Sequence, residues 1–193
     1  NMDLKEKKIG FIMTDVFYTF RRTIDEIKKL MESKAHIIPI MSEYVYEKDT
    51  KYGKAKEFIK EIENITNEKI YNTIKEIEEF YNTEKLDIII VSPASGNIIG
   101  KLANNICDDV VTYTIKAHLK YEKPVVIAIA TNDGLSSSGE NIGRLLNRKN
   151  YYFVPFRQDN PITKPRSIAF NPSYIKKSIE LALDGEQVQP ILL

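Results

Sequence analysis

The sequence predicts an α/β protein with a doubly wound parallel sheet in three layers (α/β/α), built as a single domain over residues 1–193. Short apolar runs alternate with stretches of helical periodicity, which is the pattern of βα units around a parallel sheet. The strongest run, Leu86–Val91, is dominated by β-branched residues, as in strands that are covered on both faces. A length of 193 residues suits one such domain, and no shift in composition marks a boundary.

In the first part of the chain, two short apolar runs predict strands and three stretches of helical periodicity predict helices. The helices repeat an apolar residue every three or four positions. Pro39 interrupts the second strand, which suggests an edge position or a bulge because proline has no amide hydrogen to donate. The expected strands are Ile9–Met13 and His36–Met41, the expected helices cover 20–31, 58–65 and 70–81, and 42–53 is expected to be a loop.

The second part of the chain continues the alternation of buried strands and helices. Three further strands are expected, and helical periodicity begins directly after the first of them. A segment with several prolines has no clear period and is expected to be irregular. The expected strands are Leu86–Val91, Pro124–Ala130 and Tyr151–Pro155, the helices cover 98–106, 110–121, 141–148 and 175–182, the loop is 131–139, and the irregular segment is 156–172.

Charge and composition exclude several classes of function. The chain has 28 Lys and Arg against 27 Asp and Glu, so its net charge is +1, which argues against nucleic-acid binding and leaves little repulsion between subunits. No run approaches the roughly 18 apolar residues of a membrane span, and the start lacks the apolar stretch of a signal peptide, so we expect a cytoplasmic protein.

The cysteine and the histidines predict no metal site. The single cysteine, Cys107, excludes an internal disulfide framework, and we expect it to be buried as a small apolar side chain. His36 and His118 are far apart in the sequence and are interpreted as structural or solvated residues.

Small polar residues follow three of the expected strands. Thr14, the segment Ser92–Asn97 and the segment Thr131–Asp133 would meet at the carboxyl edge of the sheet, where open α/β sheets bind ligands. The amides at the start of the helix after Ser92–Asn97 favour an anion or an electron-rich ligand. A plain turn with Ser95 or Asn97 capping the helix explains the same residues, and Asn132 fits a turn by composition.

The segment Leu86–Asn104, which contains Pro-Ala-Ser-Gly-Asn, resembles the P-A-S-x-N signature of the flavoprotein family. That family includes FMN-containing cysteine decarboxylases and prenyl-flavin-forming enzymes. Three further segments, Ala130–Leu135, Phe153–Pro161 and Gln187–Leu192, are similar to the branch of the family formed by the B subunits of dipicolinate synthases. The resemblance covers essentially the whole chain.

This resemblance implies a Rossmann-like flavoprotein fold and a role in a two-subunit oxidoreductase. The chain would act with a dipicolinate synthase A subunit, which would carry NADP, to oxidise a dihydrodipicolinate-type intermediate to dipicolinate in the mother cell of a sporulating bacterium. FMN is a candidate cofactor, a homo-oligomer is expected, and the substrate is a small dicarboxylate. Two alternatives stay open: a stand-alone FMN-dependent enzyme, such as a decarboxylase or a prenyltransferase-like protein, and a non-catalytic scaffold subunit.

The resemblance also assigns candidate site residues, although it assigns no catalytic residue. Two departures stand out: the family's T-G-S loop reads Thr14-Asp15-Val16 here, and no histidine follows the second strand, which argues against cysteine decarboxylation. The candidate cofactor-binding residues are Thr14, Ser42, Pro93, Ala94, Ser95, Gly96, Asn97, Thr131 and Asn132, and the candidate cations for a dicarboxylate are Lys101 and Arg157.

Overall fold

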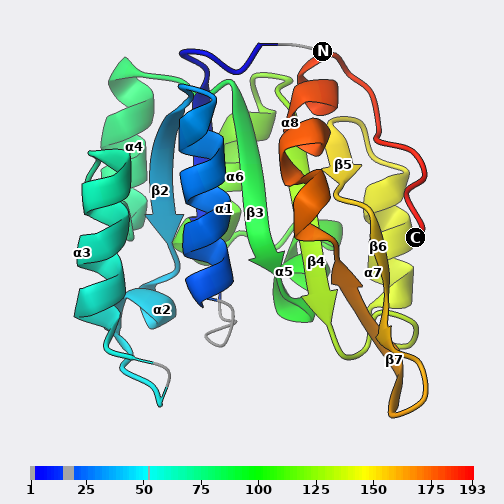
Figure 1. Ribbon diagram of the computed structural model, residues 1–193. Helices are drawn as coiled ribbons and strands as arrows, with labels where there is room; N and C mark the ends of the chain where they lie inside the picture. Colours follow the sequence, from blue (N-terminus) through cyan, green and yellow to red (C-terminus); the bar gives the residue numbers. More distant parts are fainter. Residues whose placement is uncertain (1–2, 15–19, 52) are drawn as a thin grey trace.

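A computed structural model describes residues 3–14, 20–51 and 53–193. The strands and helices alternate along the chain up to β5, as the sequence predicts (Figure 1). The strands are β1 (Lys8–Met13), β2 (His36–Met41), β3 (Ile88–Ala94), β4 (Val125–Thr131), β5 (Tyr151–Phe153), β6 (Phe156–Asn160) and β7 (Lys164–Phe170). The helices are α1 (Phe20–Glu32), α2 (Glu43–Glu47), α3 (Ala55–Thr66), α4 (Ile74–Thr83), α5 (Gly96–Ala103), α6 (Val110–Leu119), α7 (Gly139–Leu146) and α8 (Ile175–Leu183), with a 3-10 turn at Pro172–Tyr174.

The sheet is seven-stranded and mixed, with the order β2-β1-β3-β4-β7-β6. Strands β2, β1, β3 and β4 are parallel neighbours. On its far side β4 pairs in parallel with β5 through Val125–Ile127, and then antiparallel with β7 through Ala130 and Thr131. In Figure 1, α1 and α8 cover one face of the sheet, and α5 and α6 lie behind it. The three-layer α/β fold is therefore confirmed, with an antiparallel extension of the parallel sheet.

The centre of the sheet is fully buried, as expected for parallel strands covered on both faces. Every residue of β3 is buried, and the residues of β1 and β2 are buried after the first. The edge position predicted for the strand with Pro39 is also confirmed, because β2 ends the sheet. A short bridge covers this edge, where the Tyr71 amide donates to the Pro39 carbonyl at 3.0 Å.

The prediction of an irregular segment at 156–172 is wrong, because these residues form the antiparallel β6–β7 hairpin. The hairpin extends past the end of β4 at the lower right of Figure 1. Four of the five residues of β6 and the first three of β7 are exposed, so neither strand carries a long apolar run. The prolines lie in the turn and near the exposed start of β7, where they cost little sheet pairing.

Two local expectations also need correction. The expected loop 42–53 contains the short helix α2, which Ser42 caps by accepting a hydrogen bond from the Val45 amide at 3.3 Å. Cys107, expected to be buried, is exposed. Helix α5 ends at Ala103, four residues before Cys107, so the thiol lies in the connection to α6 and not on the apolar face of the helix.

The start of α5 lies close to the turn after β4. A Cβ atom added at Gly96 would lie 2.8 Å from Thr131 Oγ1, 2.9 Å from Ser138 Oγ and 3.0 Å from Asp133 Oδ1. These distances are too short for an ordinary contact, so only glycine allows the two loops to approach this closely.

We predict that Gly96→Ala destabilises the protein by about 1–3 kcal/mol, because the new methyl group must push the β4–α7 turn away. Gly143→Ala is the matched control, since nothing lies within 4 Å of the added Cβ atom in α7. There alanine should stabilise the helix by about 0.5–1 kcal/mol. Urea unfolding of the two variants measures both effects, and an equal response of the two glycines would contradict the close packing at Gly96.

His118 is a buried histidine on α6 with one hydrogen-bond partner. It is 0% exposed, and its Nε2 lies 2.9 Å from the Pro124 carbonyl oxygen, so Nε2 carries the proton and donates. Its Nδ1 has no partner among the described residues. Burial lowers the pKa of His118 from 6.5 to about 4, so the ring is neutral in the folded protein at neutral pH.

We predict that His118 makes the folded state less stable in acid. Because the folded pKa lies below the unfolded value of 6.5, its stabilisation is present above pH 6.5 and is lost as the pH falls through about 4. The loss amounts to about 3 kcal/mol. Urea unfolding between pH 7.5 and about 4 should show a weaker pH dependence for His118→Gln than for the unmodified chain.

Candidate functional site

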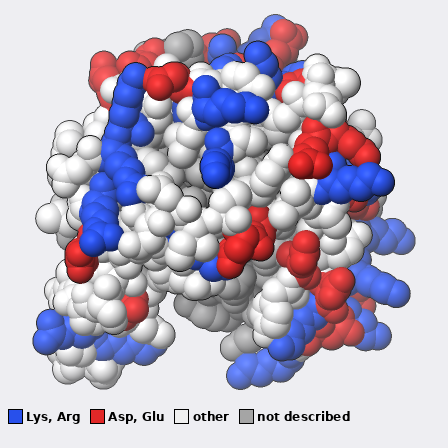
Figure 2. Space-filling view, turned by 180° about the vertical axis from the view of Figure 1, so that it is seen from behind, with Lys and Arg blue, Asp and Glu red and all other residues white. Residues whose placement is uncertain are grey.

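The three loops predicted to converge lie together at the carboxyl edge of the sheet. Thr14, which follows β1, donates its hydroxyl to the Pro93 carbonyl at the end of β3 at 2.5 Å. The start of α5 in turn contacts the loop after β4 through Gly96. This edge is the lower one in Figure 1, and from behind it is hollowed between two lobes (Figure 2). The lobes are the β6–β7 hairpin on one side and the region around α2 and the start of α3 on the other.

The segment expected as a loop at Ser92–Asn97 is shorter than predicted. Ser92, Pro93 and Ala94 belong to β3 and are buried, so the strand continues three residues beyond its apolar run. Ser95 caps α5 by accepting a hydrogen bond from the Ile98 amide at 3.4 Å, which selects Ser95 over Asn97 as the cap. The amides of Gly96 and Asn97 have no acceptor within the helix and face the edge of the sheet. Asn97 is exposed.

The two hydroxyls proposed for a phosphate are both engaged by the protein. Thr14 is 2% exposed and donates to Pro93, while Ser42 caps α2 and its amide donates to the Met13 carbonyl. Thr14 therefore links β1 to β3, and Ser42 links β1 to the loop after β2. The departure from the family's T-G-S loop at Asp15 and Val16 lies outside the described residues.

Asp133 organises the loop after β4. The sequence predicts this residue in the loop but assigns no role to its carboxylate. Its Oδ1 accepts hydrogen bonds from Thr131 Oγ1 at 2.5 Å and Ser138 Oγ at 2.7 Å, and its Oδ2 accepts from Ser137 Oγ at 3.4 Å. The bonds from Thr131 and Ser138 lower the pKa of Asp133, so the carboxylate stays ionised. The signal was an aspartate followed within five residues by three serines. Asn132 is exposed and accepts from Ser167 Oγ at 3.3 Å.

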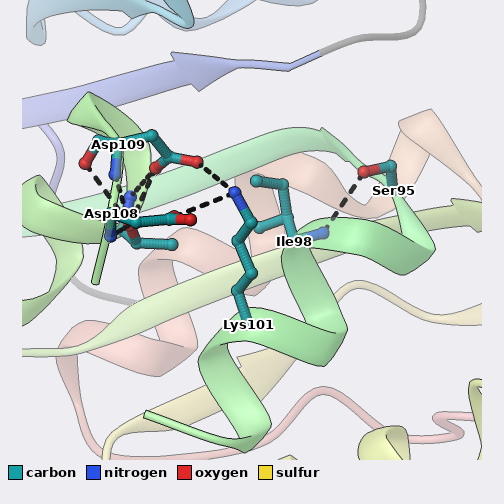
Figure 3. A network of polar contacts seen from close by, with 6 residues as sticks. Ser95, Ile98, Lys101, Asp108 and Asp109 are labelled. Atoms are coloured by element: carbon teal, nitrogen blue, oxygen red, sulfur yellow. Dashed lines mark hydrogen bonds and ion pairs between the residues drawn. The ribbon is translucent and has the colours of Figure 1, made fainter. Parts of the chain in front are cut away.

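Lys101, proposed as a cation for a dicarboxylate, is paired within the protein. Its Nζ lies 2.8 Å from Asp109 Oδ2 and 2.9 Å from Asp108 Oδ1, and Figure 3 shows the side chain pointing toward both carboxylates. Hydrogen bonds to Asp109 and Asp108 raise the pKa of Lys101. Asp109 also caps α6 through the Thr112 amide at 2.8 Å. Lys101 therefore joins α5 to the start of α6 and offers no free charge in this arrangement.

Arg157, the second proposed cation, lies on the exposed part of β6. No carboxylate in the described part of the chain forms an ion pair with it. Its guanidinium is therefore available to an anion at the hairpin side of the edge.

Metal-binding clusters and membrane-spanning helices are both absent from the described residues. Within residues 3–14, 20–51 and 53–193, no group of His, Cys, Asp and Glu could hold a metal ion. In the same residues, no helix has the length and apolar character to cross a membrane.

The start of α5 and the loop after β4 bring hydrogen-bond donors and a carboxylate close together at this edge. The first amides of α5 can donate to an electron-rich or anionic group. Ala94 is buried, and Gly96 packs against the loop after β4. The ionised Asp133 beside them favours a ligand group that donates a hydrogen bond and disfavours a phosphate at that point.

Known proteins share both the sequence and the fold. A family model described as Flavoprotein matches residues 1–163. The B subunit of dipicolinate synthase from Bacillus subtilis (strain 168) is 35% identical over 190 residues, which cover 98% of this chain and 95% of that protein. The crystal structure of the B subunit of dipicolinate synthase from Bacillus halodurans is 38% identical, with a TM-score of 0.91 over 100% of this chain and 98% of that one.

A more distant structure shares the fold alone. The FMN-dependent cysteine decarboxylase SpaF is 18% identical, with a TM-score of 0.65 over 94% of this chain and 97% of that one. The family model matches residues 1–163, and the similarity to these B subunits extends along nearly the whole chain. Both findings agree with the geometry of the loop at the end of β3. On this evidence the chain belongs to the flavoprotein family.

Proposed function

We propose that this chain is the B subunit of a two-subunit dipicolinate synthase and acts in the mother-cell cytoplasm of a sporulating bacterium. The observation that carries the proposal is similarity over 98% of the chain to a protein of that name, together with an intact ligand loop at the end of β3. A separate A subunit would bind NADP, and we expect this chain to form a homo-oligomer.

The proposed reaction is the oxidation of a dihydropyridine dicarboxylate to the aromatic pyridine-2,6-dicarboxylate. The substrate loses one hydride to NADP⁺ and one proton to solvent or to a basic group, which gives NADPH and the aromatic product. Because aromatisation supplies a strong driving force, the protein mainly has to hold the ring against the hydride acceptor. The amides at the start of α5 and the guanidinium of Arg157 would bind the carboxylates.

A flavin is the candidate cofactor of this chain. The first amides of α5, at Gly96 and Asn97, could donate to a flavin ring, whereas Ala94 is fully buried and Gly96 packs against the loop after β4. The region proposed for the phosphate fits less well, since the Thr14 hydroxyl is held by Pro93. When bound, FMN would supply a hydride acceptor in addition to NADP⁺.

A stand-alone FMN-dependent enzyme is the second candidate, and it follows from membership of the flavoprotein family. Such a protein would be yellow when purified and active without a partner. Because a flavin is a candidate cofactor in both cases, turnover by the purified chain without a partner separates the two functions, and the visible spectrum shows only whether flavin is bound.

We predict that full dipicolinate formation requires both subunits. Co-expression of this chain with the A subunit should give NADP-dependent production of dipicolinate, measured by its ultraviolet absorbance or its terbium luminescence. Each of the two proteins alone should be slower by at least about tenfold, because neither one would position the ring by itself. Production at the full rate without this chain would refute the proposal.

We predict that Ser95 serves the ligand as well as the fold. Ser95→Ala removes the cap of α5 and should cost about 1 kcal/mol of stability. Thr73→Ala removes an equivalent cap from α4, where Thr73 accepts from the Glu76 amide at 3.2 Å, and should cost a similar amount. Only Ser95→Ala, and likewise Asn97→Ala, should lower turnover of the complex, by about tenfold or more. Unchanged turnover in both variants would favour a non-catalytic scaffold.

A further inference from the structure

A buried carboxylate on α1 contacts the strand that carries the ligand loop. Glu26 is 5% exposed, and its Oε2 accepts a hydrogen bond from Ser92 Oγ at 2.9 Å. Its Oε1 lies 3.5 Å from Arg22 Nε, one helical turn away on the same helix. Ser92 is itself 0% exposed, so this hydrogen bond is shielded from water.

The contacts of Glu26 join three elements around the end of β3. The guanidinium carbon of Arg22 lies 4.5 Å from the centre of the Phe170 ring, which belongs to β7. On β3, the residue after Ser92 is Pro93, whose carbonyl accepts the Thr14 hydroxyl. A change in the charge of the Glu26 carboxylate therefore affects the ligand loop through the hydrogen bond to Ser92 and the two residues that follow Ser92 in β3.

Solvent reaches the carboxylate through a surface groove. The groove has a volume of about 580 Å³ and lies between α1 and the start of α8. The charged residues that line it beside Glu26 are Lys29 and Glu32 from α1 and Lys176 from α8, while Arg22 contacts the Glu26 carboxylate from the same helix. Lys176 Nζ also lies 3.8 Å from Glu180 Oε1. The residues of β3 and β7 that contact Glu26 and Arg22 are Ser92 and Phe170, and neither side chain titrates.

Glu26 changes its charge near neutral pH. Burial raises the pKa of Glu26 from 4.5 to about 7, against the opposing effects of the Ser92 hydrogen bond and the positive charge of Arg22. Both forms of the side chain are therefore populated in the physiological range, and the groove lets protons exchange with solvent.

We propose that Glu26 is a positioning residue for the ligand loop, and that its ionised form holds the end of β3 in the ligand-binding arrangement through Ser92. This inference rests on the proposed function, because it takes the loop after β3 as the ligand site. The ionised carboxylate accepts a charge-assisted hydrogen bond from Ser92 and balances Arg22. Protonation removes the charge, weakens both contacts and loosens the strand end. By linkage, ligand binding favours the ionised form and releases a proton.

The first test measures the affinity for FMN, used as the probe, at pH 6 and pH 8 by quenching of flavin fluorescence. The phosphate of FMN also titrates near pH 6, so the comparison with variants carries the result. The unmodified chain should bind FMN about five- to tenfold more weakly at pH 6 than at pH 8. In Glu26→Gln and in Ser92→Ala this ratio should fall to the value that the phosphate alone produces.

The matched control is Glu76→Gln on α4. Glu76 is a paired, partly exposed carboxylate that accepts hydrogen bonds from Lys69 Nζ at 2.8 Å and from the Asn72 amide at 2.9 Å, both outside β3. This variant should keep the pH ratio of the unmodified chain. A ratio that persists in both Glu26→Gln and Ser92→Ala would overturn the inference.

The second test needs no ligand. Hydrogen exchange of the peptide covering 92–99, corrected for the intrinsic pH dependence and compared with a peptide from β4 to remove the change in global stability, should show greater relative protection at pH 8 than at pH 6 in the unmodified chain and equal relative protection in Glu26→Gln. If FMN binds at neither pH while this change in protection is present, the flavin part of the proposed function fails and the positioning role stands. If protection is independent of pH in the unmodified chain, the positioning role fails.

Discussion

The end of β3 is the point on which the rest of the site depends. The strand is buried along its whole length between neighbours on both sides, so its last residues cannot move without disturbing the core. Three contacts converge there: Thr14 reaches Pro93 from β1, Glu26 reaches Ser92 from α1, and Gly96 allows α5 to lie against the loop after β4. The loop after β3 is therefore an extension of the sheet, held from three directions.

The distribution of charge at this edge limits what can bind. Asp133 is ionised and accepts hydrogen bonds from three hydroxyl groups, and Lys101 is paired with two carboxylates. A dicarboxylate placed here needs positive charge, and of the two proposed cations only Arg157 is unpaired in the described part of the chain. Much of the affinity for such a ligand must then come from backbone amides, whose contribution depends on the start of α5 being held in place.

Periodicity and apolar runs predicted the helices and the central strands because burial on both faces dictates those patterns. The same reasoning failed at 156–172, where β6 and β7 are largely exposed and are set by pairing with each other and with the end of β4. It also failed where function depends on contacts distant in sequence. Nothing local to Lys101 shows that Asp108 and Asp109 fold back onto it, and Glu26 is 66 residues from Ser92. The loop after β3 could be matched to the family signature because its residues are contiguous.

Two buried groups with strongly shifted pKa values, His118 and Glu26, act on stability in opposite directions. The neutral form of His118 stabilises the fold above pH 6.5, and this stabilisation is lost as the pH falls through about 4. The folded pKa of Glu26 is raised from 4.5 to about 7, so its contribution is fully present below pH 4.5 and is lost as the pH rises through about 7. Above that pH the fold carries an ionised carboxylate that burial disfavours. A carboxylate kept in a costly position beside the ligand loop is the kind of local strain that functional sites retain, because the same negative charge that weakens the fold strengthens the hydrogen bond from Ser92.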